Sequence, residues 1–112
     1  MPGTVDDAGI DTRTPHLDAL VERLRAHERE LREPGVVSLV IFGSRARADA
    51  RDDSDLDVLI TYDRERPFTL YDLVRVQRVL ERVTGLDVHV STRDAFPPGQ
   101  LSRLLKDAVS VL

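Results

Sequence analysis

Hydrophobic residues recur along this chain with two different periods, and each period predicts a different kind of element. In two long segments the apolar residues fall three, four and seven positions apart, which is the spacing of a helix with one buried face. The first helix is expected to begin at Pro15 behind a capping Thr14, and to end before residues 34–35. The second is expected between a capping Thr69 and Gly85. The apolar positions are Leu17, Leu20, Val21, Leu24 and Leu31 in the first helix, and Leu70, Leu73, Val74, Val76, Val79, Leu80 and Val83 in the second.

Shorter apolar runs, rich in β-branched residues or alternating with polar ones, predict strands at residues 36–42, 55–62 and 86–90. A short helix capped by serine is expected over residues 44–50, and a last helix over residues 101–111. Helices and strands therefore alternate along the chain. This order predicts an α/β (α+β) fold, in which a small mixed or antiparallel sheet of about three strands carries helices on one face.

The length and composition favour one ordinary folded domain. The chain has 112 residues, of which 41% are hydrophobic, and we expect a flexible tail over residues 1–14 and a single domain over residues 15–112. It has no cysteine, no apolar run of membrane-spanning length and no signal-peptide pattern at its start, so a cytoplasmic protein is expected. The formal net charge of −4 argues against a direct nucleic-acid ligand.

The candidate chemistry lies in residues 43–60, between and along the first two predicted strands. Gly43 lets the backbone turn sharply and approach a ligand, and the N–H groups that start at Ser44 form a partly positive pocket for phosphate oxygens. Asp55 and Asp57 alternate with Leu56, so their side chains project to the same side of a strand. Mg²⁺ commonly uses one or two carboxylates together with substrate phosphates, and this pair is our predicted magnesium site.

Asp87 on the third predicted strand is a candidate third carboxylate. It would complete a two-metal site with Asp55 and Asp57 and would act as the base for an attacking hydroxyl group. The alternative is a solvent-facing aspartate that discourages pairing at a sheet edge. His89 lies on the same predicted face as Asp87, and a lone histidine is more often an ordinary half-buried residue than a ligand.

Three arginines give the candidate site a local positive charge. Arg47 is a candidate for neutralising the triphosphate, because a guanidinium group suits phosphate oxygens. The alternative is that Arg45, Arg47 and Arg51 cover a helix surface and pair with nearby aspartates, in contacts worth about 0–1 kcal/mol each. Those aspartates are Asp49, Asp52 and Asp53.

Taken together, these motifs resemble the nucleotidyltransferase superfamily that includes DNA polymerase β. The pattern there is Gly-Ser, a spacer, Asp-x-Asp and a later aspartate. More narrowly, residues 42–47 (Phe-Gly-Ser-Arg-Ala-Arg) and 54–59 (Ser-Asp-Leu-Asp-Val-Leu) resemble the minimal nucleotidyltransferases, small prokaryotic domains usually encoded beside a helical HEPN-domain protein. The similarity covers roughly residues 34–112.

The resemblance implies a polymerase β-like fold and a role for each matching residue. Gly43 and Ser44 would hold the phosphates of ATP, and Asp55 and Asp57 would bind Mg²⁺. Asp87 matches the third carboxylate. In some pairs of this family the nucleotidyltransferase is an antitoxin that transfers AMP from ATP to a tyrosine of the HEPN ribonuclease and silences it. A HEPN-type toxin is therefore the expected partner, and the sequence leaves the oligomeric state open.

One residue departs from the family pattern. The family usually has glycine after Ala-Arg, whereas this chain has Ala48, the mildest replacement provided that φ is negative there. The departure keeps open a non-catalytic antitoxin that neutralises its partner by binding alone. Two further alternatives are nucleotide sensing without transfer, and a nucleotidyltransferase of small molecules, although such enzymes generally carry an additional helical domain to hold the acceptor.

Overall fold

A computed structural model describes residues 16–51 and 53–112 of the chain. The predicted cap at Thr14, the helix start at Pro15 and the 1–14 tail lie outside these described residues. The elements are α1 (Leu17–Arg25), α2 (Glu28–Arg32), β1 (Val36–Phe42), β2 (Leu56–Tyr62), α3 (Leu70–Thr84), β3 (Val88–Thr92), the 3₁₀ helix η1 (Arg93–Ala95), α4 (Pro98–Leu105) and β4 (Val109–Ser110). No helix among the described residues combines the length and hydrophobicity needed to cross a bilayer.

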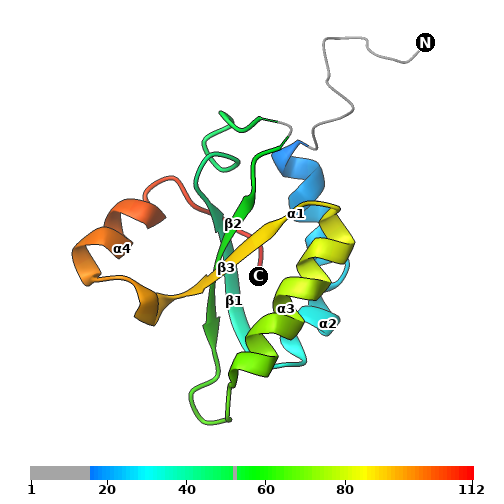
Figure 1. Cartoon of the computed structure of the whole chain (residues 1–112), viewed down its shortest axis with the longest axis vertical. Coiled ribbons are helices and arrows are strands. Elements are labelled where there is room, and N and C mark those ends of the chain that lie inside the picture. The colour runs from blue at the N-terminus through cyan, green and yellow to red at the C-terminus, as the bar shows by residue number, and fades with distance from the viewer. Residues whose placement is uncertain (1–15, 52) are drawn as a thin grey trace.

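The sheet is mixed and has the order β3-β2-β1-β4. β1 pairs with β2 and with β4 in antiparallel fashion, whereas β2 and β3 run parallel. A parallel neighbour requires a crossover connection, and α3 supplies it. Figure 1 shows α1, α2 and α3 together on one side of the sheet and α4 projecting on the other. The predicted mixed sheet is confirmed, with four strands in place of about three. Three helices cover one face as predicted, whereas α4 lies on the other side (Figure 1).

The core lies between the three helices and the sheet. Every second residue of the central strands points into it, because side chains alternate faces along a strand. The fully buried large side chains are Leu20, Leu24, Leu31, Leu39, Ile41, Leu56, Val58, Ile60, Val76 and Leu80. Burying a side chain of this kind stabilises the fold by about 1.5–3 kcal/mol. The helical period and the strand alternation in the sequence therefore identified the residues that hold the layers together.

α3 matches its predicted bounds because both ends carry strong local signals. The Thr69 side chain accepts a hydrogen bond from the N–H of Asp72, and the Asp72 carboxylate accepts one from the N–H of Thr69, which is a complete capping box. Gly85 ends the helix in the left-handed conformation with φ 73°. These contacts fix the point at which the chain leaves α3 for β3.

The single first helix that the pattern predicted is wrong. The chain forms α1 and α2, with a turn at Ala26 and His27 between them. His27 Nδ1 donates to the carbonyl oxygen of Arg23 at 3.0 Å, and this local bond competes with the continuing helical ladder. The break turns Leu31 back toward the core, where its side chain is 0% exposed.

The predicted last helix over residues 101–111 is also wrong at its end. α4 stops at Leu105, and the chain then forms β4 beside β1. Arg25 donates to the carbonyl oxygens of Val111 at 3.0 Å and Ser110 at 3.3 Å, and the Val111 side chain is buried. β-Branched valines at this edge pack better in a strand than in a helix.

Candidate nucleotide site at the start of β2

Gly43 lies directly against Asp57 where β1 meets the turn that follows it. Phe42 pairs with Asp57 across the two strands, and Gly43 leaves β1 with φ 76°. A Cβ atom at position 43 would overlap the Asp57 carboxylate, chiefly its Oδ2 oxygen. Two independent constraints therefore require glycine here, a positive φ and the close approach of a carboxylate.

Residues 43–48 form a single tight turn, which we call the 43–48 turn, and the predicted 44–50 helix is wrong. The N–H of Arg47 donates to the carbonyl of Gly43 at 3.1 Å, and that of Asp49 to Ser44 at 3.0 Å. Within the described residues, the N–H groups of Ser44 and Ala46 donate no hydrogen bond, so they remain available to an anion. The predicted phosphate pocket thus rests on the backbone of a turn, without a helix behind it.

Ala48 ends the turn with φ 63°, so the proviso of a negative φ at this position is not met. For an L-residue with a side chain, the left-handed region costs roughly 1–2 kcal/mol. Glycine would adopt the same conformation freely. Replacing the family's glycine by alanine therefore places local strain beside the candidate phosphate pocket.

Arg45 holds the turn to the loop that leads into β2. Its side chain is buried, with the residue 4% exposed. The guanidinium group donates to the carbonyl oxygen of Ser54 at 2.8 Å and 3.3 Å and to that of Arg51 at 3.3 Å. The interpretation of Arg45 as a helix-surface residue is therefore wrong. No periodic signal marks it, because only the folded loop brings the carbonyls that it binds together.

Asp57 is the half-buried carboxylate of the site. Burial raises its pKa above the ordinary aspartate value, and His89, whose Nδ1 lies 3.7 Å from Asp57 Oδ1, acts in the opposite direction. An ionised carboxylate that has lost hydration gains from a nearby cation. The donor type, the partial burial and the adjacent glycine turn fit a divalent cation such as Mg²⁺ at Asp57.

Asp55 and Asp87 occupy equivalent places on adjacent strands. The first residue pair of β2 and β3 is Leu56 with Val88, and both aspartates immediately precede it. The N–H of Leu56 donates to the carbonyl oxygen of Asp87 at 2.8 Å, which fixes the two starts side by side. Both side chains are exposed. No three His, Asp or Glu side chains of residues 16–51 and 53–112 gather closely enough to hold a metal together, so the site of three carboxylates stays a prediction.

Arg47 lies at the outer edge of this group. Its side chain is half exposed and its Nε lies 3.4 Å from Asp49 Oδ2, as the surface-pair interpretation expects. Arg47 also lowers the pKa of Asp57 slightly through its charge, so its positive field reaches the candidate metal ligand. A weak exposed pair of this kind can exchange Asp49 for a phosphate.

Comparisons with known proteins agree with this geometry. Residues 24–111 match the family model described as a nucleotidyltransferase domain. The protein adenylyltransferase MntA of Thermococcus cleftensis is 33% identical over 96 residues, which are 85% of this chain and 95% of that protein. A solved structure described as a proposed minimal nucleotidyltransferase superposes with a TM-score of 0.65 at 30% identity, over 92% of this chain and 98% of that one. A toxin–antitoxin structure with AMP-PNP gives a TM-score of 0.65 at 12% identity, over 82% of this chain and 72% of that one, which is a likeness of fold.

Proposed function

Because the chain belongs to the nucleotidyltransferase domain family, as its motifs indicated, we propose that it transfers AMP from ATP to a hydroxyl group of a partner protein. The observation that carries the proposal is the packing of Gly43 against Asp57, which sets a backbone turn with available N–H groups beside a partly buried carboxylate. The similarity to a protein adenylyltransferase over 85% of the chain supports a protein as acceptor.

Each residue of the site has a role in this proposal. The N–H groups of the 43–48 turn, beginning at Ser44, bind phosphate oxygens of ATP, and Arg47 adds positive charge at its edge. Asp55, Asp57 and Asp87 are the residues that would hold Mg²⁺. When bound, the cation would neutralise charge on the triphosphate and stabilise the leaving group.

The transfer itself is a displacement at the α-phosphorus. The acceptor oxygen forms a bond to that phosphorus, the bond to the bridging oxygen of the β-phosphate breaks, and pyrophosphate leaves. Asp87 takes the proton of the hydroxyl group and passes it to water. The protein's own contribution is mainly to position the groups and to balance their charge.

We further propose that the acceptor is a tyrosine of a HEPN-type toxin and that the chain acts as its cytoplasmic antitoxin. The resemblance of residues 42–47 and 54–59 to the minimal nucleotidyltransferases supports this partner class. The fold shared with a toxin–antitoxin structure that contains AMP-PNP is consistent with it.

The test is transfer of label from [α-³²P]ATP to the product of the neighbouring gene in the presence of Mg²⁺. We expect Asp57→Asn and Asp55→Asn to lower labelling by at least about 100-fold, because each removes a charge that holds the cation. Asp49→Asn, in the same loop, is the matched control and should keep most activity. Adenylyl transfer is rejected if the wild-type chain leaves the partner unlabelled, or if Asp57→Asn labels it as strongly as the wild type does.

The strained Ala48 favours one second candidate, a non-catalytic antitoxin that acts by binding alone. In that case the complex with the toxin would form in EDTA, and Asp57→Asn would still neutralise the toxin in cells. If adenylyl transfer is the function, Asp57→Asn leaves the toxin active even where the complex forms.

A further inference from the structure

The outward side of α3 carries exposed apolar and basic side chains that the fold does not need. Leu70 is 73% exposed, Tyr71 88% and Val74 39%, although all three lie on a regular helix whose opposite side is in the core. Single exposed apolar side chains are common, but several that adjoin one another on the surface often mark an interaction site. The α3 outer face, as we call it, consists of Leu70, Tyr71, Val74, Arg75, Arg78 and Arg82.

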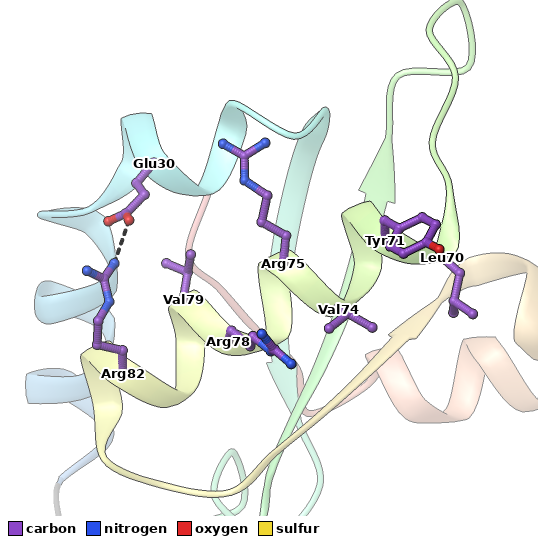
Figure 2. Close-up of a pocket in the computed structure, with 8 residues that line it drawn as sticks. All are labelled: Glu30, Leu70, Tyr71, Val74, Arg75, Arg78, Val79 and Arg82. Carbon is purple, nitrogen blue, oxygen red and sulfur yellow. Dashed lines mark hydrogen bonds and ion pairs between the residues drawn. The ribbon is translucent and has the colours of Figure 1, made fainter.

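The residues of this face are sorted along the helix. The apolar side chains occupy its first turns and the arginines its later turns. Leu70 and Val74 lie four residues apart, and Tyr71, Arg75, Arg78 and Arg82 follow one another at three or four residues, so two adjacent rows form one stripe. Figure 2 shows the side chains of this stripe, with Glu30 of α2 approaching Arg82 at one end. The stripe borders a groove of about 860 Å³ that Glu30 and Val79 also line.

The groove lies apart from the candidate nucleotide site. α3 packs on one side of the sheet, and its N-terminal end lies at the end of the molecule opposite to the 43–48 turn (Figure 1). Asp57 and His89 belong to strand positions that alternate with the core-facing ones, so they lie on the other side of the sheet. A ligand on the α3 outer face would therefore leave the nucleotide site open.

The arginines of the α3 outer face favour a ligand that carries carboxylates. Arg82 pairs with Glu30 at 2.5 Å and Arg75 pairs with Glu33, both on the surface. The Arg78 side chain forms no hydrogen bond or ion pair within the described part of the chain. Exposed pairs are weak and exchange readily with other carboxylates. Glu30 and Glu33 offset two of the three arginines, so the net positive charge of the face comes from Arg78, close to the apolar side chains.

We propose that the α3 outer face binds an acidic amphipathic helix of a partner protein. Apolar side chains of that helix contact Leu70, Tyr71 and Val74, and its carboxylates pair with the arginines farther along α3. An amphipathic helix that docks in a groove presents its apolar side chains at i, i+3, i+4 and i+7, which form one side of that helix. In a second copy bound face to face, the arginines would meet arginines if the two helices ran parallel and Leu70, Tyr71 and Val74 if they ran antiparallel. Neither arrangement offers them a new carboxylate, which disfavours a symmetric dimer here. Nucleic acid is disfavoured because it offers no aliphatic side chains to pack against the exposed Leu70 and Val74.

The probe is a designed helical peptide of about 20 residues, long enough to cover the face, with leucines on one side and glutamates beside them. Binding of the fluorescein-labelled peptide to the full chain is measured by anisotropy and mapped by amide chemical shifts. We expect the shifts to concentrate on α3, and Arg78→Glu to weaken binding by about tenfold or more. Tyr71→Asp should do the same. Arg103→Glu, on exposed α4, is the matched control and should bind as the wild type does.

Three outcomes would overturn the proposal. Equal affinity for a peptide with glutamine in place of glutamate would remove the role of the arginines. Dimerisation of the chain that Tyr71→Asp abolishes would assign the face to a second copy. Tighter binding of a single-stranded RNA oligonucleotide, lost in Arg78→Glu, would assign it to nucleic acid. Thermal melting verifies that each variant is folded, and AMP transfer to the neighbouring protein is scored separately, since either proposal can fail alone.

Discussion

The 43–48 turn and the α3 outer face both meet solvent, but the chain builds them in different ways. The turn depends on backbone conformation and buried polar contacts: Gly43 has a positive φ against Asp57, and Arg45 binds loop carbonyls from a buried position. The α3 outer face depends only on side chains that a well-capped helix displays.

This difference predicts that stability and ligand binding are coupled in the 43–48 turn and independent on the α3 outer face. In the turn the same atoms shape the fold and the site, so a substitution that changes one changes the other. On the α3 outer face the helix is held by its caps and its buried side, so substitutions there change binding alone. The predictions below test this separation, beginning with the largest expected effect.

Gly43→Ala should have the largest effect. Alanine would take a positive φ and its Cβ would overlap the Asp57 carboxylate, and strain of this kind costs about 1–3 kcal/mol per feature. We expect a loss of about 2–4 kcal/mol in the free energy of unfolding, measured with urea, together with loss of AMP transfer. Gly99→Ala is the control, because a Cβ at Gly99 in α4 meets no atom within 4 Å. Retained activity in Gly43→Ala would contradict the proposed packing role.

Arg45→Met should come next. It keeps much of the buried side-chain volume but leaves the carbonyl oxygens of Ser54 and Arg51 without their donor, a loss of about 1–3 kcal/mol. Because the loop carries Asp55 into β2, we expect the KM for ATP to rise as the unfolding free energy falls. Arg51→Met, whose side chain is exposed, should change both quantities little. If Arg45→Met lowers the stability without changing the KM for ATP, the Arg45 contacts with the loop carbonyls do not shape the nucleotide site.

Ala48→Gly should act in the stabilising direction. Glycine adopts the φ of 63° found here without strain, so the free energy of unfolding should rise by about 1 kcal/mol. Chemical denaturation measures the change. Ala50→Gly is a matched control in the same loop, because Ala48 is the one non-glycine residue with positive φ in the described chain. A lower stability of Ala48→Gly would show that the turn is not strained.

Tyr71→Ala should have the smallest effect on stability. The side chain is 88% exposed, and substitutions at such positions usually change the free energy of unfolding by less than about 0.5 kcal/mol. AMP transfer to an acceptor that does not use α3 should also be unchanged. A marked loss of stability would show that the α3 outer face supports the fold, and the separation between the two regions would then fail.

The sequence predicted the elements whose signals are local and repeated. α3 carries a capping box at one end and a glycine at the other, and β1 and β2 are mostly apolar runs, so their bounds could be predicted with small errors. The placement of Gly43 against the start of β2 also follows from adjacent antiparallel strands. The family resemblance inferred from these motifs is confirmed.

What the sequence did not predict depends on contacts between distant segments. β4 forms because it pairs with β1 and because Arg25 binds the carbonyl oxygen of Val111 beside it. The sequence of residues 109–110 alone does not indicate these contacts. Arg45 is buried because the loop folds its carbonyls around the guanidinium group. The conformation of Ala48 follows from the closing of the turn, whereas alanine itself favours a helix. Proximity of Asp55, Asp57 and Asp87 in one metal site is still a prediction.

The parallel pairing of β2 with β3 also determines when the candidate site is completed during synthesis. The contact of Asp57 with His89 and the bond from Leu56 to Asp87 join residues on either side of α3. Such non-local pairing forms only after the crossover has folded. A nascent chain that has exposed the 43–48 turn but not yet β3 therefore lacks Asp87, one of the three candidate carboxylates. The candidate site is complete only when the residues through β3 have left the ribosome.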